Sequence, residues 1–284
     1  EGVEGKYYVW DKKEVESLLQ ENTNIFCDYY NITTDGNWEG KNILNRKEKD
    51  EDIAEKYEIS VKELQEIIHR AKNILLKERQ KRIKPGLDDK ILTSWNALML
   101  KAYADAYKVF DDDHFLKVAE NNFKFIENNL LNSDFSLYRN FKNKKSTINA
   151  FLDDYVLMVD ALISLYQANF NEYYINTALN INEYINQHFY DKESGMFFYT
   201  SDNDPQLITR SKELNDHVIP SSNSVMAQNL FKLGHYFIKN DYLTKAEQML
   251  LNMKEQIESN PYYFGNWIDL MIQFIHKPYE VCIM

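Results

Sequence analysis

Two segments that combine paired carboxylates with a third polar residue could serve a site. The two segments are Asp88-Asp89-Lys90 and Asp153-Asp154-Tyr155. Neighbouring charges separate the pKa values of two carboxylates, which is what general acid–base or glycosyl chemistry requires. The same Asp residues could instead cap helices and form ion pairs, because the positive end of a helix dipole favours carboxylates.

A run of small polar residues, PSSNS at 220–224, has a similar ambiguity. Ser221 and Asn223 could offer hydroxyl and amide groups to a ligand. Pro in a first turn and Ser as a cap are also ordinary features of a helix start. Asp216 lies shortly before this run and joins the candidates.

Basic and aromatic residues near these segments complete the candidate set. Arg139, Arg210 and Lys212 fall in expected loops. They could hold an anionic substituent of a sugar or pair with the acidic excess of the chain. Trp95, followed by Asn96, could be a stacking platform for a sugar or a core residue of its helix.

An internal repeat indicates which elements position these residues. The segment LMLKA at 98–102 aligns with LMVDA at 157–161, 59 residues later. A third copy follows, since FLKVAE at 115–120 aligns with YLTKAE at 242–247. Each copy reads as a helix, a tight turn and a second helix, which is the pattern of a helical repeat protein.

The repeat predicts first helices at 94–110, 153–169 and 222–239, second helices at 113–130, 171–189 and 241–258, and a final first-type helix at 264–275. Turns within each hairpin are a few residues long, whereas connections between hairpins are long and contain β-like pieces at 136–141 and 196–200. Short turns make antiparallel hairpins, and stacked hairpins make a solenoid or a closed toroid. We therefore expect the starts of the first helices to lie at one end.

The N-terminal part, 1–90, reads as irregular entry segments and early helices. It predicts a short strand at Lys6–Trp10, a helix from Asp11 to about Gln20 with Asp11 and Glu14 as a capping pair, a helix at Thr23–Tyr30, an irregular loop at 31–46, and a long helix opened by a Ser60 capping box that ends before Pro85.

Composition excludes several classes of protein. The chain has only 8 Gly and 5 Pro in 284 residues, which favours long helices over sheets, because sheets need many turn residues. A net charge of −11 with no basic stripe argues against nucleic-acid binding. No apolar run approaches the roughly 18 residues of a membrane span. Cys27 and Cys282 are far apart and form no CxxC motif, so we expect no metal site, no cofactor and a reduced, cytoplasmic protein.

Five separated motifs resemble those of the YyaL/spermatogenesis-associated family. In order they are EGKYYVW around residues 5–10, GNWEGKNIL at 36–44, RIKPGLDDKILTSWNALM at 82–99, AFLDDY at 150–155 and PSSNS at 220–224. That family has a thioredoxin-like domain followed by an (α/α)₆ toroid, related in fold to N-acylglucosamine 2-epimerases and six-hairpin glycosidases. The resemblance implies that residues 1–284 are a partial toroid domain, with three hairpin repeats and a final inner helix at 91–284.

The resemblance also shapes the functional hypothesis. It implies a carbohydrate-handling toroid, isomerase-, epimerase- or glycosidase-like, with a sugar ligand. The alternative is a non-catalytic binding or scaffold module of a protein that also carries a thioredoxin-like domain. Either a second copy or a missing N-terminal region would cover the open edges of the incomplete ring, because exposed apolar edges usually find a partner.

The shared-site hypothesis follows from the repeat. Each predicted catalytic carboxylate precedes or begins a different inner helix, so we expect the three to converge: Asp89, Asp154 and Asp216. Histidine pairs serve related epimerases, but only His217 falls near this end of the predicted ring. Gathered carboxylates would provide an acid and a base in one cavity. If each Asp only caps its own helix, no such site exists.

Overall fold

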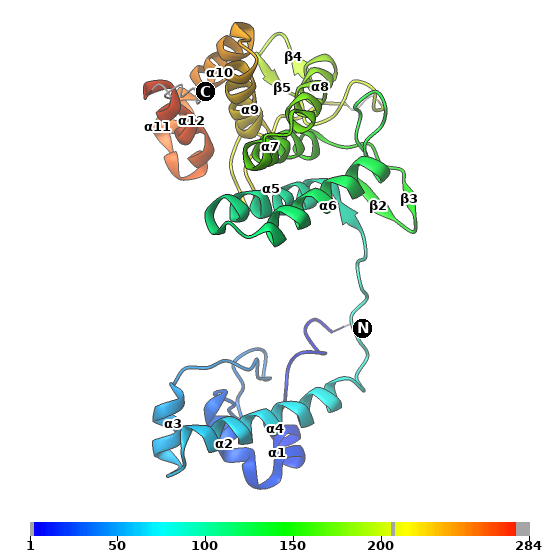
Figure 1. Ribbon diagram of the computed structural model, residues 1–284. Coiled ribbons are helices and arrows are strands. Elements are labelled where there is room, and N and C mark those ends of the chain that lie inside the picture. The colour runs from blue at the N-terminus through cyan, green and yellow to red at the C-terminus, as the bar shows by residue number, and fades with distance from the viewer. Residues whose placement is uncertain (1–2, 206–207, 277–284) are drawn as a thin grey trace. The chain divides into compact units, whose positions relative to one another are not determined.

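The chain forms two compact units in the computed structural model, which describes residues 3–205 and 208–276. Unit 1 is Glu1–Asp88 and unit 2 is Asp89–Met284 (Figure 1). Helices account for more than half of the described residues, as the scarcity of Gly and Pro predicted. That both units belong to one toroid domain stays a prediction.

Unit 1 is a small helical cluster. Its elements are α1 (Lys12–Leu19), η1 (Gln20–Asn22), α2 (Thr23–Tyr29), α3 (Asp50–Lys56) and α4 (Val61–Arg79). Side chains from every α-helix and from Trp10 form its core. The predicted cap of the long helix is confirmed, because the Glu63 backbone N–H donates to Ser60 Oγ at 3.1 Å. Burial of the α4 stripe then fixes this helix on the others.

Two predictions in unit 1 are wrong. The segment Lys6–Trp10 is not a strand: it begins as turns, and only Trp10 makes a β-bridge, with Asn42. A tight turn forms instead, because Gly5 has a φ of +68° and its carbonyl accepts from the Tyr8 N–H at 2.8 Å. Alternation of apolar residues alone could not reveal that turn.

Asp11 precedes α1 but does not cap it with its side chain. Its carboxylate instead pairs with Lys41 at 2.6 Å. Helix α3 was not predicted, because a helix of 7 residues is too short to show two full apolar periods. The predicted irregular loop around Trp38 is confirmed.

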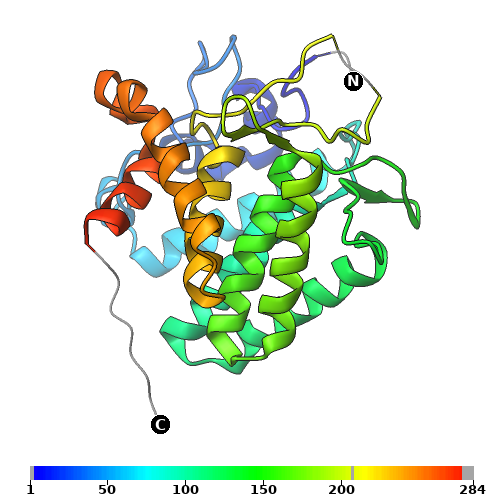
Figure 2. The ribbon, with the colours of Figure 1, turned by 90° about the horizontal axis from the view of Figure 1, so that it is seen from above.

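Unit 2 consists of three helix hairpins and a final helix. The hairpins are α5 (Thr93–Phe110) with α6 (Asp113–Asn129), α7 (Leu152–Asn169) with α8 (Glu172–His188), and α9 (Ser222–Tyr236) with α10 (Asn240–Asn252); α11 (Lys254–Ser259), η2 (Pro261–Tyr263) and α12 (Gly265–Ile275) follow. Helix α5 packs on α7, α7 on α9, and α9 on α12. In Figure 2 the green hairpin of α7 and α8 stands next to the gold and orange hairpin of α9 and α10. The first helices therefore make an inner row.

Helix α7 lies in the middle of this row and is buried from Leu152 to Leu165. It is apolar on most faces because it has neighbours on every side. The outer helix α8 is buried on one face only. One predicted boundary differs: the second helix expected at 241–258 breaks at Met253, between α10 and α11.

Short strands lie in the long connections, as predicted. Strands β1 (Ile91–Leu92), β2 (Asn140–Lys142) and β3 (Lys145–Ser146) form an antiparallel sheet, and β4 (Tyr190–Asp191) pairs with β5 (Met196–Phe197). In the first sheet Leu92 lies opposite Asn140. This register places the loop residue Arg139 beside the start of α5, where the Thr93 N–H donates to the Arg139 carbonyl at 2.9 Å.

Two sequence expectations concern the whole chain. No helix within the described ranges is long and apolar enough to cross a membrane. Cys27 is a buried free thiol whose pKa is raised by burial. Cys282 lies outside the described residues.

Candidate functional site

The starts of the inner helices meet at one end of unit 2. An Asp154 oxygen at the start of α7 accepts from the Ser94 N–H at the start of α5, at 2.9 Å. Asp216 joins the next two helices, because it accepts from the Ser221 N–H of α9 and from the Asn266 N–H of α12, both at 2.9 Å. The predicted gathering of helix starts is therefore confirmed.

A buried ionic cluster lies between the starts of α5 and α7. Asp154 has no exposed surface, and its Oδ2 accepts from Arg139 Nη1 at 3.0 Å and from the Phe151 N–H at 3.1 Å. The same guanidinium nitrogen lies 3.3 Å from Asp153 Oδ1. Arg139 also lies over the Phe151 ring, 4.8 Å from its centroid. One cation thus holds two adjacent carboxylates that were predicted as site residues.

Burial raises the pKa of Asp154, and repulsion from the Asp153 carboxylate raises it further. Arg139 and the backbone N–H of Phe151 oppose this shift. Burial alone would lower the pKa of Arg139, but the two carboxylates outweigh it and raise that pKa. Removing Arg139 would leave two buried carboxylates side by side without a counter-charge, which is strongly unfavourable.

Tyr199 connects this cluster to solvent. Burial raises the pKa of its phenol, and the charge of the Asp153 carboxylate raises it further. The phenol therefore stays protonated at neutral pH and can donate a hydrogen bond. Its backbone is fixed as well, because the Leu152 N–H donates to the Tyr199 carbonyl at 2.9 Å.

A depression of about 570 Å³ opens beside Tyr199. Loop residues before α9 make up most of its lining: Ser211, Lys212, Glu213, Leu214, Asn215 and His217. Glu213 lies at the start of α9, where its Oε2 accepts from the Ser222 N–H at 3.0 Å. This hydrogen bond fixes one carboxylate oxygen of Glu213 against the first turn of α9. The depression therefore holds a carboxylate and a protonated phenol, a possible base and donor.

We define the helix-start site as Arg139, Asp153, Asp154, Tyr199 and Glu213. Sequence reasoning missed Tyr199 and Glu213, because both come from the long loop before α9 and follow no helical period. The weak signal was the loop itself, since long ordered connections on a rigid scaffold often carry function.

Other predicted residues act as structural links at this end. Asp216 Oδ1 accepts from the Ser221 N–H and from Ser224 Oγ, and Ser221 Oγ caps α9 by accepting from the Ser224 N–H. Asn223 is fully buried and holds β5, because it both accepts from and donates to the Phe197 backbone, at 2.9 and 3.0 Å. These contacts match the alternative in which polar residues secure helix starts.

The predicted basic residues of the long loop also have partners. Arg210 and Lys212 lie over the same Phe198 ring, 4.1 and 4.4 Å from its centroid. Lys212 pairs with Asp191 at 2.8 Å, and Arg210 donates to the Thr200 carbonyl. Lys212 lines the depression, whereas Arg210 does not.

Asp89 does not join the helix-start site. It is exposed and pairs with Lys142 at 2.6 Å, which lowers the pKa of its carboxyl. Because β1 and β2 run antiparallel, Asp89 and Lys142 lie beyond the end of the ladder that is farthest from Thr93. Asp88 belongs to unit 1, and Lys90 is exposed beside Asp89.

Three further residues that were predicted to bind the substrate do not line the depression. Trp95 is 63% exposed on α5. The Asn96 amide donates to the Leu92 carbonyl at 2.8 Å. Tyr155 lies in the core, where its hydroxyl accepts from the Leu137 N–H at 2.9 Å and leaves no face for a ligand.

Hairpins with their inner helix starts at one end define an incomplete (α/α) toroid. A solved GH76 α-mannanase from Bacteroides thetaiotaomicron is similar to this chain, with a TM-score of 0.54 and 15% identity over 68% of this chain and 56% of that one. The fold predicted from the repeat and the motifs is thereby confirmed.

The curated relatives support the resemblance found in the motifs. Human spermatogenesis-associated protein 20 is 27% identical over 91% of this chain, and an uncharacterised protein of Caenorhabditis elegans is 28% identical over 91%. The chain spans only 37% and 38% of the length of these two relatives. No family model matches the sequence.

Proposed function

We propose that the helix-start site binds a sugar and transfers a proton on it. The observation that carries the proposal is the juxtaposition of the Glu213 carboxylate and the protonated Tyr199 phenol in one depression. The (α/α) toroid of this chain is also the fold of an α-mannanase, so a carbohydrate is the substrate class that we favour.

Each residue of the site has a defined part in this proposal. Glu213 is the base, since it lines the depression and a backbone amide at the start of α9 holds its carboxylate in place. Tyr199 donates a hydrogen bond to a sugar oxygen, because its raised pKa keeps the phenol protonated. Asp153 orients the phenol, and Arg139 and the buried Asp154 position Asp153.

The three carboxylates that were predicted to be catalytic have other roles in this proposal. Asp154 remains in the proposed site as a positioning residue, since it is buried away from solvent. Asp216 secures the starts of α9 and α12. Asp89 has no part in the reaction that we propose.

The test uses two substitutions that each remove one chemical function. A panel of reducing mono- and disaccharides is incubated with the full chain, and isomerised, epimerised or hydrolysed products are followed by NMR. Glu213→Gln and Tyr199→Phe should each lower turnover by about 100-fold or more, the usual contribution of a positioned acid or base. Tyr262→Phe, at a tyrosine that is 87% exposed, is the matched control.

Full turnover in both site variants would contradict the proposed chemistry. Sugar binding without turnover in the wild-type chain would favour the non-catalytic binding module. The cytoplasmic location and the covering of the ring edges, by a second copy or by a missing region, stay predictions; sedimentation of the chain tests the second copy.

A further inference from the structure

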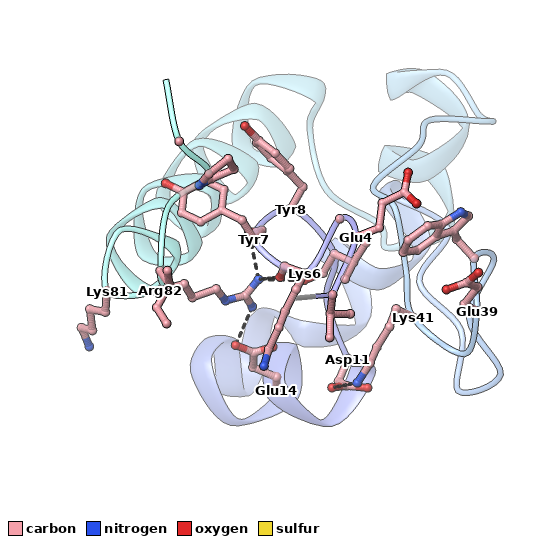
Figure 3. Close-up of a pocket in the computed structure, with 17 residues that line it drawn as sticks. Glu4, Lys6, Tyr7, Tyr8, Asp11, Glu14, Glu39, Lys41, Lys81 and Arg82 are labelled. Atoms are coloured by element: carbon pink, nitrogen blue, oxygen red, sulfur yellow. Dashed lines mark hydrogen bonds and ion pairs between the residues drawn. The ribbon is translucent and has the colours of Figure 1, made fainter. Parts of the chain in front are cut away.

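A cavity in unit 1 takes no part in the helix-start site. Its volume is about 1100 Å³. Residues of three separate segments, 3–9, 38–41 and 81–86, line it together with Asp11 and Glu14. Figure 3 shows side chains from all three around one hollow. Parts of the first three motifs that carry the family resemblance, EGKYYVW, GNWEGKNIL and RIKPGLDDK, therefore converge here.

The floor of this cavity is held by one guanidinium. Arg82 donates from Nη1 to the carbonyls of Tyr7 at 3.1 Å and Val9 at 2.8 Å, and from Nη2 to Glu14 at 2.7 Å (Figure 3). Its charged end also lies over the Trp10 ring, 4.0 Å from the centroid. The floor is thus built from charge-assisted bonds that fix segment 3–9 against the end of α4.

The wall that carries Trp38 is a tight, preformed loop. Backbone bonds join Trp38 and Lys41 in both directions, at 3.0 and 2.9 Å. Gly36 has a φ of +76°, and a Cβ added there would clash with the Lys41 backbone. The loop therefore requires glycine, and it presents Trp38 in a fixed position before any ligand arrives.

The charges around the cavity balance one another. Asp11 and Lys41 pair at 2.6 Å with about half of each side chain exposed, and Glu14 is neutralised by Arg82. Such a lining favours a ligand of no net charge. The exposed pair still offers acceptors and donors at the rim, while Trp38 and the 57% exposed Tyr8 offer aromatic surface.

We propose that this Trp38 cavity binds a neutral oligosaccharide. The apolar face of a sugar ring would lie on Trp38, and its hydroxyls would bond to Asp11 and Lys41. A volume of about 1100 Å³ is slightly above the roughly 300–1,000 Å³ of small-ligand pockets, so a chain of several sugars fits better than one. The inference needs no chemistry at the helix-start site.

The test measures binding of neutral hexasaccharides of mannose and of glucose to the full chain by isothermal titration calorimetry. Trp38→Ala should weaken binding about tenfold or more, which corresponds to the loss of one good aromatic contact. Trp95→Ala, at the exposed tryptophan of α5, should leave the affinity unchanged. An effect of Trp95→Ala without one of Trp38→Ala would place the sugar on unit 2 and overturn the inference, while leaving the proposed function intact.

A second measurement guards against misfolding of the variant. In the wild-type chain, saturating hexasaccharide should slow amide hydrogen exchange in segments 3–9 and 36–43, and Trp38→Phe should restore part of the affinity. No binding of either hexasaccharide, or binding with unchanged exchange in both segments, would overturn the inference.

Discussion

In the Trp38 cavity of unit 1 the ion pair of Asp11 and Lys41 lies half exposed at the rim, whereas in the helix-start site of unit 2 the carboxylates of Asp153 and Asp154 are buried. Asp11 and Lys41 can exchange each other for water at little cost. Asp154 and Arg139 cannot replace each other with water in this way, because neither has another partner of opposite charge that is as close and as deeply buried. The comparison teaches that the same kind of interaction, an ion pair, can be available to a ligand in one region and stabilise the fold in the other.

The two regions also differ in what positions their residues. The Trp38 loop depends on glycine geometry and backbone bonds within a few residues. The helix-start site depends on helices and loops that are far apart in the sequence. Changes in unit 2 should therefore affect stability more than changes at the rim of unit 1.

The largest effect is expected from Asp154→Leu. It leaves Arg139 with Asp153 as its remaining carboxylate partner, and two buried backbone N–H groups, those of Ser94 and Phe151, lose their acceptor. Losing one member of a buried pair costs about 3–5 kcal/mol of unfolding free energy. Urea denaturation of the variant at neutral pH measures this loss. A loss below that of an exposed pair would break the comparison between the two regions.

A smaller loss is expected from Asp216→Ala, because one carboxylate caps two helices. Each lost cap costs about 1 kcal/mol, so the total should be about 2 kcal/mol. Asp216→Asn keeps one acceptor and should recover part of it. Equal stability of wild type and Asp216→Ala in thermal melts would contradict this capping role.

The pH dependence of stability sharpens the comparison further. The pKa of Asp154 is raised in the folded state, so the folded chain holds this proton more firmly than the unfolded chain. The resulting stabilisation is complete below the unfolded pKa of about 3.9 and is lost as the pH rises through the higher folded value. The free energy of unfolding of wild type relative to Asp154→Asn should therefore fall as the pH rises from 4 to 8. Between the unfolded and the folded pKa values the expected decrease is roughly 1.4 kcal/mol per pH unit. Denaturation at several pH values tests this, and an advantage that grows with pH would show that the pKa is lowered instead.

The smallest effect is expected from Asp11→Asn in unit 1. Exposed ion pairs contribute about 0–1 kcal/mol, so unfolding should barely change. Binding of the hexasaccharide should weaken, because a charged acceptor is lost from the rim. Lys13→Gln, close by on α1, is a control for loss of surface charge. A stability loss as large as that of Asp216→Ala would show that the pair maintains the fold of unit 1.

The sequence was sufficient for the inner and outer helices of unit 2. The repeat at 98–102 and 157–161 predicted the bounds of α5 and α7 within a residue or two, because helical periodicity depends only on the spacing of apolar residues along the chain. Loop lengths also predicted the common end of the helix starts, since a short turn forces two helices to be antiparallel. The strand expected at Lys6–Trp10 was wrong, because the pattern of apolar residues does not reveal that Gly5 has a positive φ and turns the backbone.

Only the tertiary structure decided which polar residues share a site. Asp153 and Asp154 lie together because they are adjacent in the sequence. Their common partner Arg139 comes from a loop whose position is set by the register of β1 and β2. Glu213 and Tyr199 meet for the same reason, because a long connection folds back over the start of α9. In unit 1, likewise, Trp38 and Arg82 come to one cavity from segments 44 residues apart. Spacing along a helix is a local property, whereas a site built from loops is determined by which distant surfaces pack together.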